Sequence, residues 1–203
     1  MSATTTHPAG DTARIADDTA RKVGEIKALL RPLMNGVLSQ SLRERGLRYR
    51  LIYGIELPRL KELAATLDKS HALAQALWKE DIRECRILAG MLQPPETFLP
   101  DICDIWMDDI HDAELADYTC MSLFRHLPYA SEKAFQWIAS DDALEQYTGY
   151  RLLCHLLNKP GAVLSPRAHD ELEDQASAAA ESPNRALAEV AAMALDRLRE
   201  KKD

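Results

Sequence analysis

Apolar side chains recur every three or four residues through most of the chain, and this spacing limits the fold more than any other feature. It is the period of an α-helix that buries one face. Pro32 interrupts the first such stretch, so one helix is predicted before it and another after it. Runs of β-branched residues are few, and only eight Gly and ten Pro occur in 203 residues. The sequence therefore predicts an all-α protein.

A tryptophan–aspartate pattern divides the middle of the chain into repeating units. The three tryptophans lie 28 and 31 residues apart, and an aspartate follows each of them after three or four residues. We expect each tryptophan to pack in the core near the end of one helix. Each aspartate is expected to cap the next helix, because its carboxylate accepts the unpaired N–H groups there. The pairs are Trp78 with Asp81, Trp106 with Asp109, and Trp137 with Asp141.

Helix pairs that recur at about 30–40 residues are typical of α-solenoids, in which each pair buries its apolar face against its neighbours. A last pair is predicted at about 165–180 and 184–201. The predicted fold is an α-solenoid, a right-handed superhelix of HEAT-like antiparallel helix pairs, with residues 18–203 as a single domain. Residues 1–17 are small and polar and are expected to form a disordered tail. An irregular helical bundle is the structural alternative.

Charge is distributed unevenly, although the formal total is −7. Between Arg21 and Lys61 there are ten basic and three acidic residues, whereas between Glu96 and Gln146 there are two basic and twelve acidic ones. The total argues against a nucleic-acid binder, but the basic segment is suited to phosphate contacts, which gain from counterion release. A solvated helix face is the plainer interpretation. The predicted DNA-binding residues are Arg43, Arg45, Arg48, Arg50, Arg59, Lys61, Arg83 and Arg86.

Sequence motifs for common chemistries are missing. The chain has no Walker loop, GxGxxG, GxSxG or HExxH, and His111 and Glu114 lack a recognised ligand spacing, so neither a cofactor nor a metal is predicted. The four cysteines form no CxxC pair and are expected to be buried, reduced thiols. With no stretch of 18 apolar residues and no signal peptide, we expect a cytoplasmic protein without a membrane partner.

Two stretches resemble the DNA alkylation repair enzyme family. The first is Tyr53-Gly-Ile-Glu-Leu-Pro58-Arg-Leu-Lys-Glu-Leu-Ala, and the second is Leu77-Trp78-Lys-Glu-Asp-Ile-Arg83-Glu84-Cys-Arg86-Ile-Leu-Ala89. The similarity covers roughly residues 21–200 and is greatest to short, acidic bacterial members. It implies a HEAT-like α-solenoid. The studied members are DNA glycosylases that release cationic alkylpurines, so the resemblance also implies damaged duplex DNA as a partner.

The glycosylases of that family share a Trp four residues before an Asp, an Arg one helix later, and a Trp in the last helix. When this pattern is aligned with the sequence, the family's Asp corresponds to Asp117. The resemblance implies that Asp117 stabilises positive charge on the sugar as the base departs. The two Trp positions fall on Ala113 and Met193, and the Arg position falls near Tyr147. Arg151 lies one turn further on and is not expected to replace the Arg. Of the pattern, only the carboxylate is retained.

Three functions remain open from the sequence. The first is a DNA glycosylase, a hydrolase of N-glycosidic bonds, with Asp117 as its catalytic residue. The second is a nucleic-acid binder without catalysis, and the third is a HEAT-like scaffold for a protein partner. Aromatic contacts to a nucleotide contribute about 1–3 kcal/mol each. Losing two of them and an arginine would slow a glycosylase by a factor of roughly thousands, which argues against catalysis.

Overall fold

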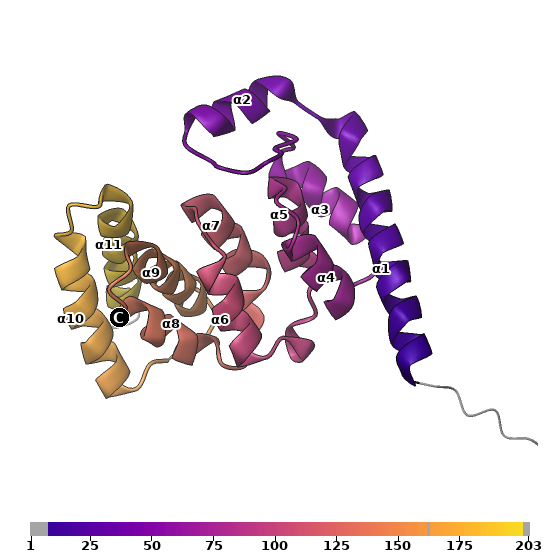
Figure 1. The fold of residues 1–203 in the computed structure, drawn as a ribbon. Coiled ribbons are helices and arrows are strands. Elements are labelled where there is room, and N and C mark those ends of the chain that lie inside the picture. Colours follow the sequence, from indigo (N-terminus) through magenta and orange to yellow (C-terminus); the bar gives the residue numbers. More distant parts are fainter. Residues whose placement is uncertain (1–7, 162, 201–203) are drawn as a thin grey trace, which may run out of the picture. The chain divides into compact units, whose positions relative to one another are not determined.

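The structure, a computed structural model, describes residues 8–161 and 163–200 (Figure 1). Within these ranges the regular secondary structure is helical, apart from one isolated bridge between Leu51 and Ile82. The all-α fold expected from the apolar spacing is therefore confirmed. The chain divides into two compact units, Met1–Pro94 and Pro95–Asp203. The single domain expected for residues 18–203 stays a prediction.

The first unit begins with a long helix that ends where the proline was expected to break it. Pro32 lies in a short 3-10 turn, and Pro58 lies in the first turn of α3, where its missing N–H costs nothing. Ser70 caps α4 by accepting a hydrogen bond from the N–H of Leu73, as its position before the helix predicted. The helices are α1 (Pro8–Leu30), α2 (Gly36–Glu44), α3 (Leu57–Ala65), α4 (His71–Trp78) and α5 (Arg83–Leu92).

The N-terminal end of α1 differs from the expected disordered tail. The helix begins at Pro8, so it includes residues 8–17, which the sequence assigns to the tail. The expectation for residues 1–7 lies outside the described residues.

In the second unit, α9 is the central helix, since it packs against α7, α8 and α11. Helix α10 in turn packs against α11. Two 3-10 turns, Pro95–Thr97 and Phe124–His126, precede α6 and follow α7. The helices are α6 (Pro100–Asp108), α7 (Ala113–Ser122), α8 (Ala130–Ile138), α9 (Ala143–Leu157), α10 (Pro166–Ala180) and α11 (Arg185–Arg199).

The three tryptophans are core residues, as predicted. Each of Trp78, Trp106 and Trp137 is almost fully buried. In the second unit, the Phe98 ring meets Trp106 edge-on at a centroid distance of 4.8 Å, and Phe124 lies 5.2 Å from Trp137. Such aromatic pairs add to the free energy gained by burial.

The predicted aspartate caps are wrong, because the helices begin one or more residues later than expected. Asp109 ends α6, and α7 is capped by Asp112, whose carboxylate accepts from the N–H of Leu115 at 2.8 Å. Asp142, rather than Asp141, caps α9. Helix α5 follows Ile82, which provides no side-chain cap.

The four cysteines are free and buried, as expected. Burial raises the pKa of Cys85 and of Cys103 to about 12, so both remain thiols at neutral pH. Among the described helices, none combines the length and the apolar character needed to cross a membrane.

Candidate functional site

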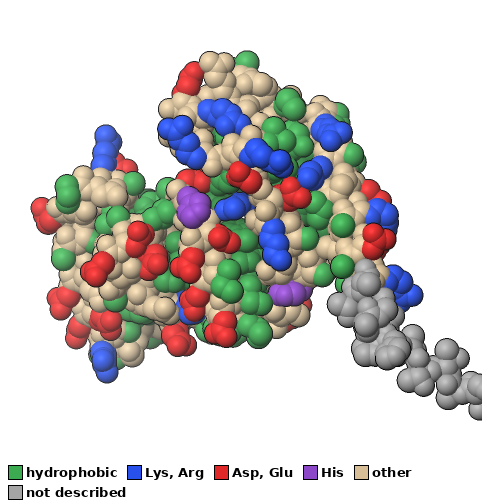
Figure 2. All heavy atoms as spheres, viewed as in Figure 1, with side chains coloured by type: hydrophobic (Ala, Val, Ile, Leu, Met, Phe, Trp, Pro, Cys, Tyr) green, Lys and Arg blue, Asp and Glu red, His purple; other side chains and the backbone are tan. Residues whose placement is uncertain are grey.

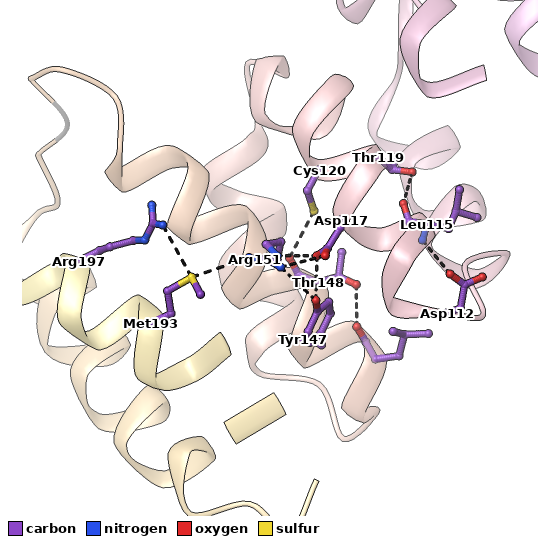
Figure 3. A network of polar contacts seen from close by, with 11 residues as sticks. Asp112, Leu115, Asp117, Thr119, Cys120, Tyr147, Thr148, Arg151, Met193 and Arg197 are labelled. Carbon is purple, nitrogen blue, oxygen red and sulfur yellow. Dashed lines mark hydrogen bonds and ion pairs between the residues drawn. The ribbon is translucent and has the colours of Figure 1, made fainter. Parts of the chain in front are cut away.

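Asp117 on α7 is bound by two side chains from α9 (Figure 3). Arg151 donates from Nε to Oδ1 at 2.5 Å and from Nη2 to Oδ2 at 2.9 Å, which makes a bidentate ion pair. The hydroxyl of Tyr147 donates to Oδ1 at 2.9 Å. The side chains of Arg151 and Asp117 are 27% and 31% exposed. Asp117 is therefore a paired, partly accessible carboxylate rather than a solvated helix residue.

The packing of α7 on α9 fixes this geometry. Tyr147 and Arg151 are four residues apart, so they lie on the same face of α9. The thiol of Cys120, three residues after Asp117 on α7, donates to the carbonyl of Thr148 at 3.6 Å. The guanidinium of Arg151 also lies 5.9 Å from the centre of the Tyr147 ring. The Cys120 contact between the helices and the position of Arg151 over the Tyr147 ring thus hold the three-residue network in one arrangement.

Helix α11 contributes two further residues to the network. The sulfur of Met193 lies 3.8 Å from Arg151 Nη1 and 3.7 Å from Arg197 Nη2 (Figure 3). Arg197 also donates from Nη1 to the carbonyl of Cys154 at 3.0 Å. Three helices of the second unit therefore meet at one polar network.

Electrostatics keep the two α9 side chains of the network, Arg151 and Tyr147, protonated at neutral pH. Hydrogen bonding to Asp117 raises the pKa of Arg151 further above its usual range, so the guanidinium stays charged. Burial, together with the charge of Asp117, raises the pKa of Tyr147 to about 12. The tyrosine therefore remains a neutral hydrogen-bond donor.

The three positions aligned with the family's Trp and Arg residues lie in the same region as Asp117, although none supplies an exposed aromatic ring. They are Ala113, Tyr147 and Met193. Ala113 is the first residue of α7, four residues before Asp117. Tyr147 is buried under the ion pair, and Met193 is 37% exposed. Sequence reasoning set Arg151 aside, yet this residue reaches Asp117 directly. The four-residue spacing from Tyr147 was the signal that could have identified it.

A second group of candidate residues follows α2 in the first unit. We call residues 45–50 the arginine loop; Arg45, Arg48 and Arg50 on it are exposed. No hydrogen bond or ion pair to another described residue occupies these three side chains. Arg43 instead stabilises the loop, because it donates to the carbonyls of Tyr49 and Arg50.

The sequence at the end of α2 explains the shape of the arginine loop. Gly46 has a φ of 101°, a conformation that glycine adopts without strain. Its N–H donates to the carbonyl of Arg43, and the N–H of Leu47 donates to the carbonyl of Leu42. This pair of hydrogen bonds is a Schellman motif, and Leu47 packs beside it against the buried cluster of Leu42, Tyr49 and Ile52. Both ends of the loop are held, because Leu51 then pairs with the segment before α5.

The remaining predicted DNA-binding residues have different surroundings. Arg59 forms an exposed ion pair with Glu62, and Lys61 is exposed on the same helix. Arg86 lies over the rings of Tyr49 and Trp78, with its guanidinium carbon 6.0 and 5.6 Å from their centres. These contacts limit the freedom of Arg86 to turn toward a phosphate.

Arg83 does not lie on the surface, which corrects its assignment to the DNA-binding set. It is buried, and its Nη1 donates to the carbonyl of Ile55 and to Glu84. Glu84 is itself fully buried and accepts the backbone N–H groups of Tyr53, Gly54 and Ile55. The two motif stretches quoted above therefore meet in the core, where they fasten the loop before α3 to α5.

Surface charge follows the division seen in the sequence. In Figure 2, Lys and Arg side chains gather over the unit that contains α2, whereas Asp and Glu side chains predominate over the unit that contains α8 and α10. Among the described residues, no group of three or more His, Cys, Asp or Glu side chains is arranged to hold a metal ion.

Comparison with known proteins identifies one family and one similar fold. The profile of a family described as DNA alkylation repair enzyme matches residues 26–187. A solved structure represents a new family of proteins related to the HEAT-like repeat DNA glycosylases, with affinity for branched DNA structures. It matches with a TM-score of 0.77 and 20% identity, over 88% of this chain and 79% of that chain. This likeness confirms the predicted HEAT-like repeat fold. No curated protein gives a significant match.

Proposed function

Because the chain belongs to the DNA alkylation repair enzyme family, we propose that it binds DNA through the arginine loop without cleaving N-glycosidic bonds. The observation that carries the proposal is the set of three exposed arginines, Arg45, Arg48 and Arg50, which have no acidic partner among the described residues. Arginines that neutralise phosphates release condensed counterions, and this release drives binding. The loop is held at both ends, so little conformational entropy is lost when DNA binds.

Branched DNA is the first substrate class to test. The structural neighbour is related to HEAT-like repeat DNA glycosylases and has affinity for branched DNA structures. Phosphate contacts alone do not read sequence, so a loop of arginines suits recognition by DNA shape and charge. A four-way junction and a linear duplex of equal length therefore form the natural pair of probes.

The absence of glycosylase activity is inferred from the surroundings of Asp117. A carboxylate stabilises a developing sugar cation through its negative charge. Here Arg151 already neutralises that charge, and the hydroxyl of Tyr147 occupies Oδ1 as well. Ala113 and Met193 stand at the positions where the family glycosylases have aromatic rings, so stacking on the nucleotide is lost.

A glycosylase with a rearranged site is the alternative, favoured by the partial exposure of Asp117. In this alternative, Arg151 replaces the family arginine and turns from Asp117 to a DNA phosphate. The carboxylate would then be free to face the sugar. The partner of Arg151, either Asp117 or a DNA phosphate, thus distinguishes the non-catalytic binder from the glycosylase.

Fluorescence anisotropy of labelled DNA tests binding. The wild-type protein is expected to bind at low salt, and replacing Arg45, Arg48 and Arg50 together by Glu should weaken binding at least tenfold. Arg59→Glu is the matched control, because Arg59 is exposed but already paired with Glu62. Arg59→Glu should weaken DNA binding less than replacing any one of the three loop arginines by Glu does. Absence of binding at low salt, or equal binding by the triple variant, contradicts the proposal.

Base release from methylated DNA tests catalysis. The wild-type protein should release no more methylated purine than Asp117→Asn does. Release that depends on Asp117 overturns the non-catalytic part of the proposal and establishes the alternative. The Arg151→Ala variant then separates the two roles of the arginine, because an inhibitory ion pair predicts faster release and a phosphate contact predicts slower release.

A further inference from the structure

A groove in the second unit shares no residue with the network around Asp117. Its volume is about 660 Å³, and it lies where α8 and α10 end. It is lined by residues 138–141 at and after the end of α8, by residues 178, 179 and 181–183 at the end of α10, and by Gln146 and Tyr150 of α9. We call this the α8–α10 groove.

Gly149 allows the end of α8 to come close to α9. A Cβ atom at this position would lie 2.8 Å from the nitrogen of Ile138 and 2.9 Å from the carbonyl oxygen of Ala134. Real Cβ atoms do not approach other atoms so closely, so any larger residue would push α8 and α9 apart. The glycine therefore places the last turn of α8 beside the following residue, Tyr150.

Tyr150 is a buried side chain with an unused polar group. It is 1% exposed, and its hydroxyl makes no hydrogen bond with the described residues. This oxygen is nevertheless not fully enclosed by the protein. Tyr150 also lines the groove. We infer from these two facts that the hydroxyl opens to the groove. Burial raises the pKa of Tyr150 to about 12, so the group is neutral at physiological pH.

The rest of the groove is electronegative. The C-terminal ends of α8 and α10 both line it, and helix C-termini carry partial negative charge. Neither helix has a basic residue in its last turn to offset that charge. Asp141 and Glu181 add two exposed carboxylates, neither of which is paired with another described residue. Among the described residues, no Lys or Arg lines the groove.

We propose that the α8–α10 groove binds a cationic group with N–H donors, a guanidinium or a primary ammonium. Asp141 and Glu181 supply the charge, and the hydroxyl of Tyr150 accepts a hydrogen bond from the cation. Apolar atoms of Ala178 and Leu187 contact the aliphatic chain that carries the cation. The same carboxylates repel phosphates, so the groove is separate from the proposed DNA interface and does not depend on it.

Isothermal titration calorimetry of the full chain with three probes tests this site. Agmatine and spermidine represent free amines, and the capped peptide Gly-Arg-Gly represents an arginine of a protein. At least one is expected to bind with a saturable heat. Tighter binding of the peptide than of the free amines assigns the groove to a basic protein segment, and the reverse order assigns it to small amines. No saturable binding of any probe overturns the proposal.

Three variants locate the binding. Tyr150→Phe keeps the ring and should weaken binding about tenfold, because it removes one hydrogen bond to a charged group. The double change Asp141→Asn with Glu181→Gln should abolish it. Glu132→Gln, on the exposed first turn of α8, is the matched control and should bind as the wild type does. Equal affinity in all variants rules the groove out, as does displacement by tetramethylammonium, which has no N–H donor.

DNA binding separates the two proposals. Tyr150→Phe should bind DNA as the wild type does, and the triple arginine-loop variant should bind the cationic probes as the wild type does. If each variant loses only its own interaction, cation binding in Tyr150→Phe and DNA binding in the arginine-loop variant, the two sites are independent.

Discussion

Arg151 donates to both carboxylate oxygens of Asp117 across the packing of α9 on α7. Tyr147, one turn earlier on α9, donates to one of the same oxygens. The single carboxylate retained from the family pattern is thus one member of a three-residue unit. A change at any of the three residues should alter the other two.

Replacing Asp117 and Arg151 singly should cost more stability than replacing them together. Asp117→Asn leaves the guanidinium without its partner, and Arg151→Gln leaves the carboxylate charge uncompensated. Both side chains are less than a third exposed, so we expect a coupling free energy of about 1–2 kcal/mol. Urea unfolding of the wild type, both single variants and the double variant measures it. Simple additivity of the two single changes would show that the ion pair adds no stability.

Tyr147 should make the protein lose stability in alkaline solution. Its pKa is raised to about 12 in the folded chain, whereas a tyrosine in an unfolded chain titrates near 10. The raised pKa contributes stability that is fully present below about pH 10 and is lost as the pH rises toward 12. The difference in unfolding free energy between the wild type and Tyr147→Phe should therefore shrink over that interval. A constant difference across the interval, or a tyrosinate absorbance of normal midpoint, contradicts this assignment.

Local signals in the sequence predicted the helices well. Pro32 marks the end of α1, Ser70 caps α4, and the three tryptophans are buried, because each feature depends on neighbouring residues or on the helical period. The caps at Asp112 and Asp142 were missed because more than one aspartate follows Trp106 and Trp137, and only the helix start decides between them.

The side chains of the site depend on tertiary packing, which a single sequence does not reveal. The contact of Arg151 with Asp117 requires a particular rotation of α9 against α7, and one residue of error would turn the arginine away. The sequence predicts Arg83 as a DNA-binding residue, although an arginine can be buried where it has a partner. Its partner, Glu84, is the adjacent residue, and sequence order alone does not show that both side chains turn inward.

Glu84 should be the most sensitive carboxylate in the first unit. It accepts three backbone N–H groups and one hydrogen bond from Arg83, all of them in the core. Glu84→Gln leaves the buried guanidinium uncompensated, so we expect a loss of about 3–5 kcal/mol in unfolding free energy. Glu62→Gln breaks an exposed pair and should cost less than about 1 kcal/mol. Similar losses in the two variants would mean that the buried pair is not required for folding.

Gly54 and Gly24 should respond to alanine in opposite directions. A Cβ atom on Gly54 would lie 2.3 Å from the carbonyl oxygen of Asn35, and its φ is 73°. Gly54→Ala should therefore destabilise the protein by about 2 kcal/mol or more. Gly24 lies inside α1 with no described atom within 4 Å of the added methyl group, so Gly24→Ala should stabilise by about 0.5–1 kcal/mol. Thermal unfolding of both variants tests the difference, and a shift of the same sign in both contradicts it.

The arginine loop should determine how steeply DNA binding depends on salt. Each phosphate contact adds about 0.9 to the slope of log K against log salt concentration for duplex DNA. Replacing Arg45, Arg48 or Arg50 singly by Ala should lower the slope by about that amount, and the triple change should lower it by about three times as much. Arg43→Ala removes hydrogen bonds to the carbonyls of Tyr49 and Arg50, so it should weaken binding by loosening the loop while changing the slope less. Titrations from low to moderate salt measure these slopes. An unchanged slope in the triple variant would place the phosphate contacts elsewhere on the chain.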